Sequence, residues 1–420
     1  MAKKFLSFLG ANNYNECIYN CPNEKQSSKF IQEALIKDLC KDWTQKDKAI
    51  IFLTKKARNY NWENHAERGE GLAKKLNKLK DTYKLQIIDK DIPDGQNVDE
   101  IWDIFRIMID SLNDDDEVIF DITHSFRSIP MLALVVLNYA KVIKNIKIIG
   151  IYYGAFDAKD ENNIAPVFNL NEFDRLLEWA YSINSFIKFG NSKQILELVK
   201  EAQKTDERYR GDIYRFVTRL NDFTSNILTC RGMQNEEIKK SVSAAYKKVK
   251  ESIEIVKTKN IVPPIIPLVE LVENRTMSFD CNDNLETGIA FIEWCIDNNL
   301  VQQGYTALDE TIKTYICNKF NLDQKNKTHR ENIAAMAINV YQKSEDKWYV
   351  NDEYKDIVKK IIKETPKELF EIADSVRNAR NDINHFGFKS DINSIKSYET
   401  LERDLKSLYD RFKKILKNKF

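Results

Sequence analysis

The 420-residue sequence predicts an α/β domain followed by two all-α domains. Three observations lead to this prediction. Short β-branched and aromatic runs alternate with amphipathic stretches up to residue 166. No proline occurs from Val167 to Val262, where apolar residues recur at helical spacing, and the prolines within residues 263–267 then interrupt the chain before a further helical region. We therefore predict domains over residues 1–166, 167–267 and 268–420.

The first domain is expected to be a parallel, doubly wound sheet of the Rossmann type. Runs of β-branched and aromatic residues are typical of buried strands, and the helical segments between them supply the crossover connections. The strands are predicted at Phe5–Leu9, Ala49–Leu53, Leu85–Ile88, Glu117–Ile122 and Ile146–Tyr153. The helices are predicted near residues 28–41, 66–80, 98–112 and 128–143.

Four loops of this sheet are candidate binding segments, because ligands bind beyond the carboxyl ends of parallel strands. Their residues are Gly10, Ala11, Asn12 and Asn13 after the first strand, Thr54 after the second, Thr123, His124, Ser125, Phe126 and Arg127 after the fourth, and Tyr153 and Gly154 after the fifth. The first loop lacks the full glycine pattern of a dinucleotide site, and the sequence contains no Walker-type Gly-Lys-Ser/Thr loop. NAD binding and nucleoside-triphosphate hydrolysis are therefore disfavoured.

The loop after the fourth strand has the richest chemistry. It combines hydroxyl, imidazole and guanidinium groups just before a predicted helix start at Ser128, with Pro130 in the first turn. A helix N-terminus beside such side chains binds anions readily. In the simpler alternative, Asp121 and Thr123 only anchor the end of the strand and Arg127 points into water.

The terminal domain is expected to contain an amphipathic helix with the sequence Arg380-Asn381-Asp382-Ile383-Asn384-His385. Apolar residues at positions 369, 372, 376, 379 and 383 repeat in steps of three and four, which predicts a buried stripe. At roughly 100° per residue, Asn381 and His385 lie away from this stripe, and Arg380 flanks their face. Gly387 follows where a helix C-terminus is expected.

Arg380 and His385 have the properties that RNA cleavage requires. Since the 2′-hydroxyl of RNA is the nucleophile, the protein must move protons and stabilise charge on the phosphate. Histidine titrates near neutral pH, and a guanidinium group binds phosphate oxygens through a planar set of donors. Asn381 would orient the substrate. The simpler alternative is a solvated surface arginine beside a histidine that complements the helix dipole.

Both motifs resemble those of a known family. Arg380 and His385 resemble the R-x4–6-H motif of HEPN ribonucleases, in which a polar residue such as Asn381 commonly follows the arginine. The segment Asp121-Ile122-Thr123-His124 followed by Phe126-Arg127 resembles the D-x-T-H-G signature of CARF domains, with Ser125 in place of the glycine. The two motifs occur in the same order as in the CARF–HEPN ancillary ribonucleases of type III CRISPR systems. By this resemblance the first domain is a CARF domain and the last a HEPN domain.

The resemblance implies a metal-independent endoribonuclease that cleaves single-stranded RNA in antiviral defence. A cyclic oligoadenylate would be its allosteric activator, and no other cofactor is expected. Attack by the 2′-hydroxyl would leave a 2′,3′-cyclic phosphate. Because one helix supplies a single arginine and a single histidine, a homodimer or a higher oligomer is expected to complete the site. Two alternatives stay open: a non-catalytic cyclic-oligonucleotide receptor or regulator, and an enzyme whose CARF domain also degrades the activator.

The composition suits a soluble, cytoplasmic protein with no membrane partner. Charged residues make up 31% of the chain, and 65 basic against 64 acidic residues give a net charge of +1, so any nucleic-acid-binding patch must be local. No run of about 18 apolar residues is present, and the apolar stretch at the N-terminus is too short for a signal peptide. Seven scattered cysteines favour free thiols, and Cys17 and Cys21 lack a second pair that would complete a zinc site.

Further predictions concern the helical part of the chain. The lysines between residues 239 and 250 are expected to form a solvated helix face, and Thr328–Glu331 fits a capping box. Glu310 is a candidate for positioning Arg380 or His385, although a surface glutamate is the simpler interpretation. The sequence shows neither a distinct basic recognition helix nor the paired carboxylates and lysine of a restriction-type nuclease, which disfavours DNA readout and that nuclease class.

Overall fold

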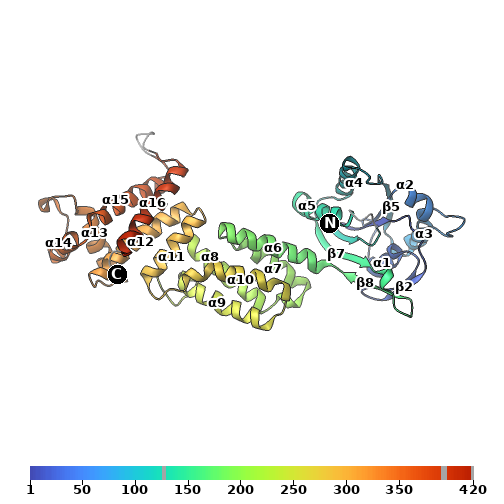
Figure 1. The fold of residues 1–420 in the computed structure, drawn as a ribbon, viewed down its shortest axis with the longest axis horizontal. Coiled ribbons are helices and arrows are strands. Elements are labelled where there is room, and N and C mark those ends of the chain that lie inside the picture. Colours follow the sequence, from blue (N-terminus) through green and yellow to red (C-terminus); the bar gives the residue numbers. More distant parts are fainter. Residues whose placement is uncertain (125–128, 389–394, 418–420) are drawn as a thin grey trace. The chain divides into compact units, whose positions relative to one another are not determined.

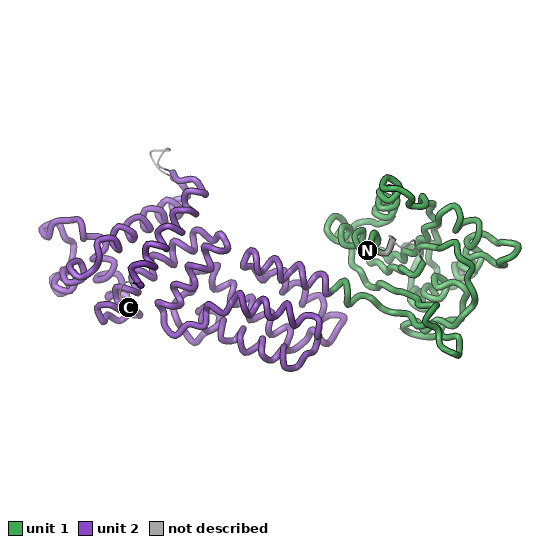
Figure 2. The backbone as a smooth tube through the Cα atoms, viewed as in Figure 1, with its two compact units in different colours: residues 1–175 green, residues 176–420 purple. Residues whose placement is uncertain are grey.

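The computed structural model describes residues 1–124, 129–388 and 395–417 (Figure 1). The chain forms two compact units, Met1–Arg175 and Leu176–Phe420 (Figure 2). Three candidate binding residues, Ser125, Phe126 and Arg127, lie outside the described residues, as does the predicted helix start at Ser128. No described helix combines the length and the apolar character needed to cross a membrane.

Unit 1, Met1–Arg175, contains an eight-stranded sheet with the order β3-β2-β8-β7-β6-β1-β4-β5. The strands are β1 Lys3–Leu9, β2 Cys17–Asn20, β3 Lys25–Ser28, β4 Lys48–Leu53, β5 Gln86–Asp91, β6 Glu117–Asp121, β7 Lys147–Gly154 and β8 Ile164–Asn169. The run β7-β6-β1-β4-β5 is parallel throughout. These are the five predicted strands, and their order is that of a Rossmann-type sheet.

The prediction of a wholly parallel sheet is wrong at one edge. β8 pairs antiparallel with β7, β2 pairs parallel with β8, and β3 pairs antiparallel with β2, so the sheet is mixed. β2 and β3 have only four residues each, and the sequence of β3 is wholly polar. Strands this short lack the apolar run by which a strand is recognised, and short polar strands are common at sheet edges.

Helices cover both faces of the sheet. The helical elements described up to residue 170 are α1 Ile31–Leu39, α2 Lys55–Ala57, η1 Arg58–Trp62, α3 Leu72–Tyr83, α4 Val98–Asp110, α5 Ile129–Lys144 and η2 Phe156–Ala158. Alternate residues of β1 enter different cores: Phe5 packs in the core that contains residues of α1 and α3, and Leu6 packs in the core that contains residues of α4 and α5. The period-2 alternation of strand side chains therefore produces the three-layer arrangement that the sequence predicts.

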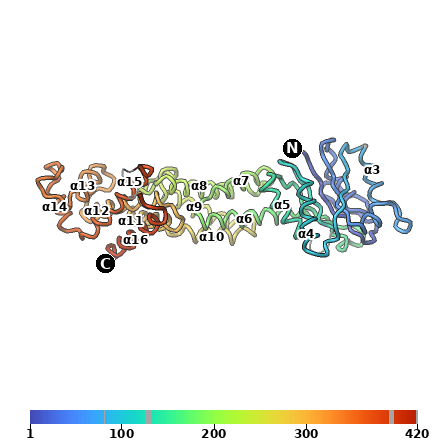
Figure 3. Tube along the Cα trace, turned by 90° about the horizontal axis from the view of Figure 1, so that it is seen from above, coloured from blue at the N-terminus to red at the C-terminus, as the bar shows by residue number. Residues whose placement is uncertain are grey.

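All elements described between residues 176 and 417 are helical. The longer helices of this part are α6 Asn171–Phe189, α7 Lys193–Thr205, α8 Asp212–Leu228, α9 Val242–Lys259, α10 Ile266–Thr276, α11 Asn284–Asp297, α12 Val301–Lys319, α14 Lys355–Glu364, α15 Lys367–Asn384 and α16 Tyr398–Lys417. The shorter ones include η7 His329–Ala334 and α13 Ala335–Val340. Helices α7 to α10 pack along one another (Figure 3).

Unit 2, Leu176–Phe420, has two hydrophobic cores. The first contains buried residues from Trp179 to Cys295, and the second contains buried residues from Ile292 to Ile415. The first core thus extends past residue 267, where a boundary is predicted from the proline cluster. The division into 1–166, 167–267 and 268–420 stays a prediction.

Two predictions for the helical part of the chain can be compared with the structure: the solvated lysine face and the capping box. Most of the cluster lies on α9, where Lys248 and Lys250 pair with Glu251 and Asp280, as a solvated helix face requires. The capping box is wrong, because Thr328 itself has helical backbone angles and its side chain caps nothing. Asn326 is the capping residue, since its side-chain oxygen accepts from the amides of Thr328 at 2.8 Å and His329 at 3.3 Å.

Candidate functional sites

The first candidate site lies at the carboxyl ends of β1 and β6, where the order of the parallel strands in unit 1 reverses. β1 is flanked by β4 on one side and β6 on the other, so the loops after β1 and β6 leave the sheet side by side. This arrangement is the topological switch point at which open α/β sheets bind ligands. Ser7 of β1 lies opposite Asp121 of β6, and the serine hydroxyl donates to Oδ2 of Asp121 over 2.7 Å.

Thr123 ties the ends of β6 and β7 together. Its amide and its hydroxyl both donate to Oδ1 of Asp121, over 3.0 and 2.6 Å, and the hydroxyl accepts from the amide of Gly154 over 2.8 Å. Burial raises the pKa of Asp121 to about 6, against the opposing effect of these hydrogen bonds. Asp121 and Thr123 thus perform the anchoring role of the simpler alternative, and Gly154 is part of the same network.

Tyr14 and His124 bring the two loops of the switch point into contact. Their ring centroids are 4.3 Å apart, with an angle of 30° between the planes. Nε2 of His124 is buried and makes no hydrogen bond within the described part of the chain, and burial lowers the pKa of His124 to about 4. The imidazole is therefore neutral at pH 7, with one nitrogen left to bind a ligand. Tyr14 ends the first candidate loop in the sequence, but it is not among the residues predicted to bind a ligand.

Gly10 permits the close approach of this tyrosine. A Cβ atom at Gly10 would lie 2.3 Å from the Tyr14 hydroxyl oxygen and 3.6 Å from Cβ of His124. The first distance is far below an ordinary van der Waals contact, so a side chain at position 10 would displace the tyrosine. The glycine therefore has a steric role in the first loop.

Asn61 and Arg68 hold the backbone of the first loop. The Asn61 amide donates to the carbonyl oxygens of Gly10 and Asn12, each over 2.8 Å. Nη1 of Arg68 donates to the carbonyl oxygen of Ala11 over 2.9 Å. Neither residue is predicted from the sequence, because they follow the loop by about 50 residues and only the fold brings them back to it.

The structure also describes three other predicted binding residues, Asn13, Thr54 and Tyr153. Asn13 is exposed in the first loop. Thr54 is buried and caps α2 by accepting from the amide of Ala57 over 3.2 Å. Tyr153 is 39% exposed, and its ring stacks on Phe168 at a centroid distance of 6.4 Å.

The second candidate site is the outer face of α15 in unit 2. Leu369, Ile372, Val376 and Ala379 are buried in the second core, whereas Asn381 and His385 are exposed. His385 is the C-cap of the helix, and its amide donates to the carbonyl oxygen of Asn381 over 2.9 Å. The face opposite the buried stripe thus has the composition that the sequence predicts.

The end of α15 differs in detail from the prediction that Gly387 terminates it. The first residue with positive φ after the cap is Phe386, at 57°, and Gly387 follows at 71°. The amide of Phe386 donates to the carbonyl oxygen of Ile383 over 3.1 Å, and the amide of Gly387 donates to that of Asp382 over 3.2 Å. This pair of hydrogen bonds is a Schellman motif with an aromatic residue at the left-handed position.

A buried carboxylate of α12 holds Arg380. Nη1 of Arg380 donates to Oδ2 of Asp309 over 2.6 Å, and Nζ of Lys313 lies 2.8 Å from the same oxygen. Asp309 is 7% exposed, while the arginine side chain keeps a third of its surface exposed. The guanidinium group is therefore oriented by the ion pair and still accessible to a ligand.

Glu310, the predicted positioning residue, binds Lys313 and Arg330 instead of Arg380 or His385. Its carboxylate lies 2.9 Å from Nζ of Lys313 and 2.7 Å from Nη2 of Arg330. Although burial opposes the shift, these two cations hold the pKa of Glu310 below its usual value. The carboxylate that contacts Arg380 is the preceding residue, Asp309, which the sequence analysis missed.

Metal-ligating and thiol chemistry is limited in the described part of the chain. Among the residues that the structure describes, no group of three or more His, Cys, Asp or Glu side chains is placed to hold a metal ion. All seven cysteines are free thiols, as predicted. Burial raises the pKa of Cys230, which lies close enough to Arg231 and Arg380 for their charges to oppose that shift.

Comparison with known proteins gives two family matches. Residues 4–157 match the family described as CRISPR system endoribonuclease Csx1, CARF domain. Residues 175–278 match the family described as CRISPR-associated protein MJ1674, second domain.

The chain is also similar to individual proteins. It is 30% identical over 302 residues to CRISPR-associated protein MJ1674 of Methanocaldococcus jannaschii. The alignment covers 69% of this chain and 44% of the relative, so the chain spans less than half the length of that protein. The solved structure of Enterococcus italicus Csm6 bound to cyclic hexa-2′-fluoro-hexa-dAMP aligns with a TM-score of 0.44 and 12% identity, over 99% of this chain and 93% of that chain.

Proposed function

Since the chain is an ancillary protein of type III CRISPR systems and contains a CARF domain over residues 4–157, we propose that it is a ribonuclease switched on by a cyclic oligoadenylate. The observation that supports the catalytic part of the proposal is the outer face of α15. There Arg380 is oriented by Asp309, and Asn381 and His385 are exposed. This face has the groups that cleavage of a phosphodiester requires, and no metal is part of the proposed step.

The activator would bind at the switch point of the sheet in unit 1. A cyclic oligoadenylate presents adenine rings and phosphates. The rings of Tyr14 and His124 offer an aromatic surface and a ring nitrogen that has no hydrogen-bond partner among the described residues, and Arg68 adds a positive charge at the first loop. Ser125, Phe126 and Arg127, which lie outside the described residues, are also predicted from the sequence to bind the activator.

The catalytic step would be attack by the substrate's own 2′-hydroxyl on the adjacent phosphorus. Arg380 would donate to the phosphate oxygens as negative charge builds there, which lowers the barrier. His385 would exchange protons with the reacting oxygens, and Asn381 would orient the strand. The P–O5′ bond breaks, and the products are a 2′,3′-cyclic phosphate and a 5′-hydroxyl end.

A homodimer would supply the second arginine and histidine. An apolar face on α5, formed by Met131, Val135 and Val142, supports this assembly because these side chains are 76%, 57% and 84% exposed in the single chain. An exposed apolar face of this kind marks an interaction surface. Trp102 of α4, which is 58% exposed, is a further large apolar side chain in the same unit.

Coupling between the two sites requires the activator to prefer one arrangement of the dimer. A ligand shifts an equilibrium only by its difference in affinity for the two states. The alternative of a non-catalytic receptor keeps the activator site and dispenses with cleavage. In the other alternative, the CARF domain also degrades its activator, and this alternative is favoured by Nε2 of His124, which has no hydrogen-bond partner in the part of the chain that the structure describes.

The chemistry can be tested with a substrate that lacks its nucleophile. Single-stranded RNA with one 2′-deoxynucleotide at a mapped cleavage position would be incubated in EDTA with cyclic tetra- or hexa-adenylate. We expect cleavage to disappear at that position alone and to persist at neighbouring ones. Cleavage at the deoxy position would refute attack by the 2′-hydroxyl. Activator binding without cleavage of any RNA would favour the receptor.

A further inference from the structure

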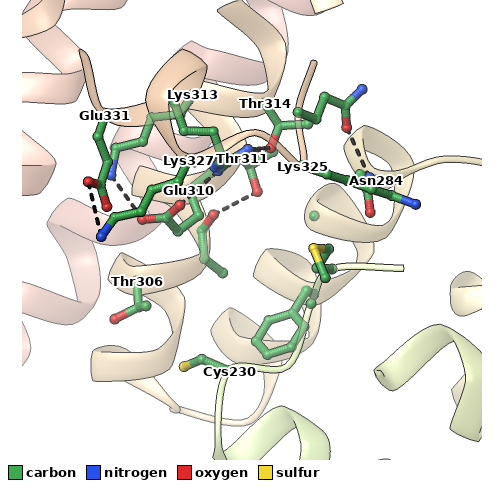
Figure 4. A pocket seen from close by; sticks show the side chains of 17 residues that line it. Cys230, Asn284, Thr306, Glu310, Thr311, Lys313, Thr314, Lys325, Lys327 and Glu331 are labelled. Carbon is green, nitrogen blue, oxygen red and sulfur yellow. Dashed lines mark hydrogen bonds and ion pairs between the residues drawn. The ribbon is translucent and has the colours of Figure 1, made fainter. Parts of the chain in front are cut away.

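A cavity of about 410 Å³ lies in unit 2, and Figure 4 shows the side chains that line it. It is enclosed by α11, α12, the segment that follows α8 and the segment that leads into η7. A volume of a few hundred Å³ is suited to one small-molecule-sized group. None of the predicted catalytic residues lines it, so its walls need an explanation of their own.

One wall of the cavity is apolar. Phe291 of α11 is 2% exposed, and Met233 and Cys230 of the segment after α8 lie beside it. Figure 4 shows the Cys230 side chain pointing toward the cavity. A flat, apolar group can pack against such a wall, and nucleic-acid bases commonly use aromatic and apolar side chains in this way.

The basic side chains on the polar side of the cavity differ in their ion pairs. Lys313 pairs with Asp309 and Glu310, Arg330 pairs with Glu310, and Lys327 lies 3.8 Å from Glu331.

By contrast, the amine of Lys325 has no carboxylate within ion-pair distance among the residues described, and it is exposed. The hydroxyl of Thr306 likewise makes no hydrogen bond within the described ranges. The cavity therefore offers an uncompensated positive charge, a free hydroxyl and an apolar wall, which together match a phosphate, a polar base edge and the face of a base.

The cavity adjoins the arginine of the candidate catalytic face. Lys313 lines the cavity, and its amine and Nη1 of Arg380 bind the same oxygen of Asp309, over 2.8 and 2.6 Å. The charge of Arg380 also acts on the thiol of Cys230 in the apolar wall. A strand whose phosphate contacts Arg380 would thus have its neighbouring nucleotide at the cavity.

We infer that this cavity binds one nucleotide of the single-stranded RNA, next to the phosphate that is cut. The base lies against Met233 at the apolar wall, its edge meets Thr306, and its phosphate lies at Lys325. This inference rests on the proposed ribonuclease function and deepens it, because the cavity makes the position of the cut depend on the flanking base.

Binding can be measured without cleavage in the His385→Ala background. A fluorescein-labelled 12-nucleotide single-stranded RNA would be titrated by anisotropy with the dimeric full chain and cyclic oligoadenylate, over several salt concentrations. We expect Lys325→Ala to weaken binding roughly three- to tenfold and to lower the salt slope by about 0.7, the value for one lost phosphate contact on a single strand. Lys414→Ala, an exposed lysine of α16 that does not line the cavity, is the matched control and should leave both quantities unchanged.

Filling the cavity provides a second test. Thr306→Trp would place a large ring in it, whereas Thr306→Ser keeps the hydroxyl and removes only a methyl group. In the otherwise wild-type chain, cleavage sites would be mapped on an RNA that contains all dinucleotide steps. We expect Thr306→Trp to change the base preference beside the cut and Thr306→Ser to preserve it. Competition by AMP tests whether a free nucleotide is the occupant instead.

The outcomes separate the two proposals. If RNA affinity, salt slope and base preference are unchanged in the Lys325 and Thr306 variants while the wild type cleaves, the cavity inference fails and the ribonuclease function stands. If the wild type binds RNA through these residues without cleaving it, the cavity binds a nucleotide, but its place beside a cut phosphate and the ribonuclease function both fail. If AMP alone depends on Lys325, the cavity holds a free nucleotide and the inference is overturned. If the wild type neither binds nor cleaves RNA, both are rejected.

Discussion

The guanidinium group of Arg380 donates to the buried carboxylate of Asp309 over 2.6 Å, across the interface of α15 and α12. The same oxygen of Asp309 accepts from Lys313. Asp309 therefore binds both Arg380 and Lys313, and Lys313 is also paired with Glu310. The ion pair fixes the direction of the arginine, and Asp309 acts through Arg380 as a positioning residue.

Asp309→Asn should lower kcat of RNA cleavage about tenfold and change KM little, because Arg380 loses its fixed orientation while the side-chain shape is kept. A tenfold change corresponds to about 1.4 kcal/mol in the activation free energy. Glu293→Gln is the matched control, since Glu293 is a paired carboxylate that binds Lys413 and Tyr409 and does not line the cavity. Equal effects of the two substitutions on kcat would contradict a specific role of Asp309.

Gly10→Ala should reduce the affinity for the cyclic oligoadenylate about tenfold, because its Cβ would lie 2.3 Å from the hydroxyl of Tyr14. The same geometry predicts that removing the tyrosine hydroxyl restores the affinity. In the double variant Gly10→Ala/Tyr14→Phe the hydroxyl is absent, and the nearest ring carbon, Cζ, is 3.6 Å away, an ordinary contact. Calorimetric titration should show restored affinity in the double variant. A double variant as weak as Gly10→Ala would show that the tyrosine is not the cause.

The pH dependence of unit 1 should change when His124 is replaced. Burial lowers its pKa to about 4, so between pH 4 and 6.5 the unfolded chain binds more protons and the histidine makes the fold less stable as pH falls. Asp121 acts in the opposite direction, because its pKa is raised to about 6 and the folded state binds more protons between pH 3.8 and 6.

His124→Gln removes only the first of these effects. Relative to wild type, the variant should gain stability on acidification from pH 6.5 to 4, with a slope of up to about 1.4 kcal/mol per pH unit for one proton. Hydrogen exchange of peptides from β6, measured in the full chain, reports this difference. Parallel pH profiles for the two proteins would mean that His124 titrates normally.

Val135→Asp on the apolar face of α5 should weaken dimerisation and reduce RNA cleavage together, because a buried carboxylate at the interface lacks a partner. Sedimentation equilibrium and cleavage assays at the same protein concentrations measure the two effects. Met277→Asp, a substitution of an exposed apolar side chain in unit 2, is the control and should leave the dimer intact. A fully dimeric, active Val135→Asp protein would exclude this face as the dimer interface.

The sequence predicts those features that depend on local periodicity. The five parallel strands and the buried stripe of α15 follow from the spacing of apolar residues, so the exposure of Asn381 and His385 could be derived. The strands β2 and β3 could not, since four residues give too little pattern. Phe386 departs from the expectation of glycine at a left-handed position because hydrogen bonds to Ile383 and Asp382 stabilise the helix end.

Contacts between distant segments explain the missed site residues. A change of one residue rotates a side chain by about 100° on a helix, so choosing between Asp309 and Glu310 as the partner of Arg380 requires the packing of α12 against α15. Asn61 and Arg68 reach the first loop only through the fold of the chain between η1 and α3. No local signal distinguishes these residues from other polar residues.

The central claim is that a cyclic oligoadenylate switches on cleavage by the α15 face. The most direct measurement is cleavage of end-labelled single-stranded RNA in EDTA, with and without cyclic tetra- or hexa-adenylate, by the wild type and His385→Ala. Asn378→Ala, an exposed position on the same helix, is the control. We predict cleavage only with an activator, its loss in His385→Ala despite retained activator binding, and its persistence in Asn378→Ala. Equal cleavage by His385→Ala and wild type, or cleavage that ignores both activators, would contradict the claim.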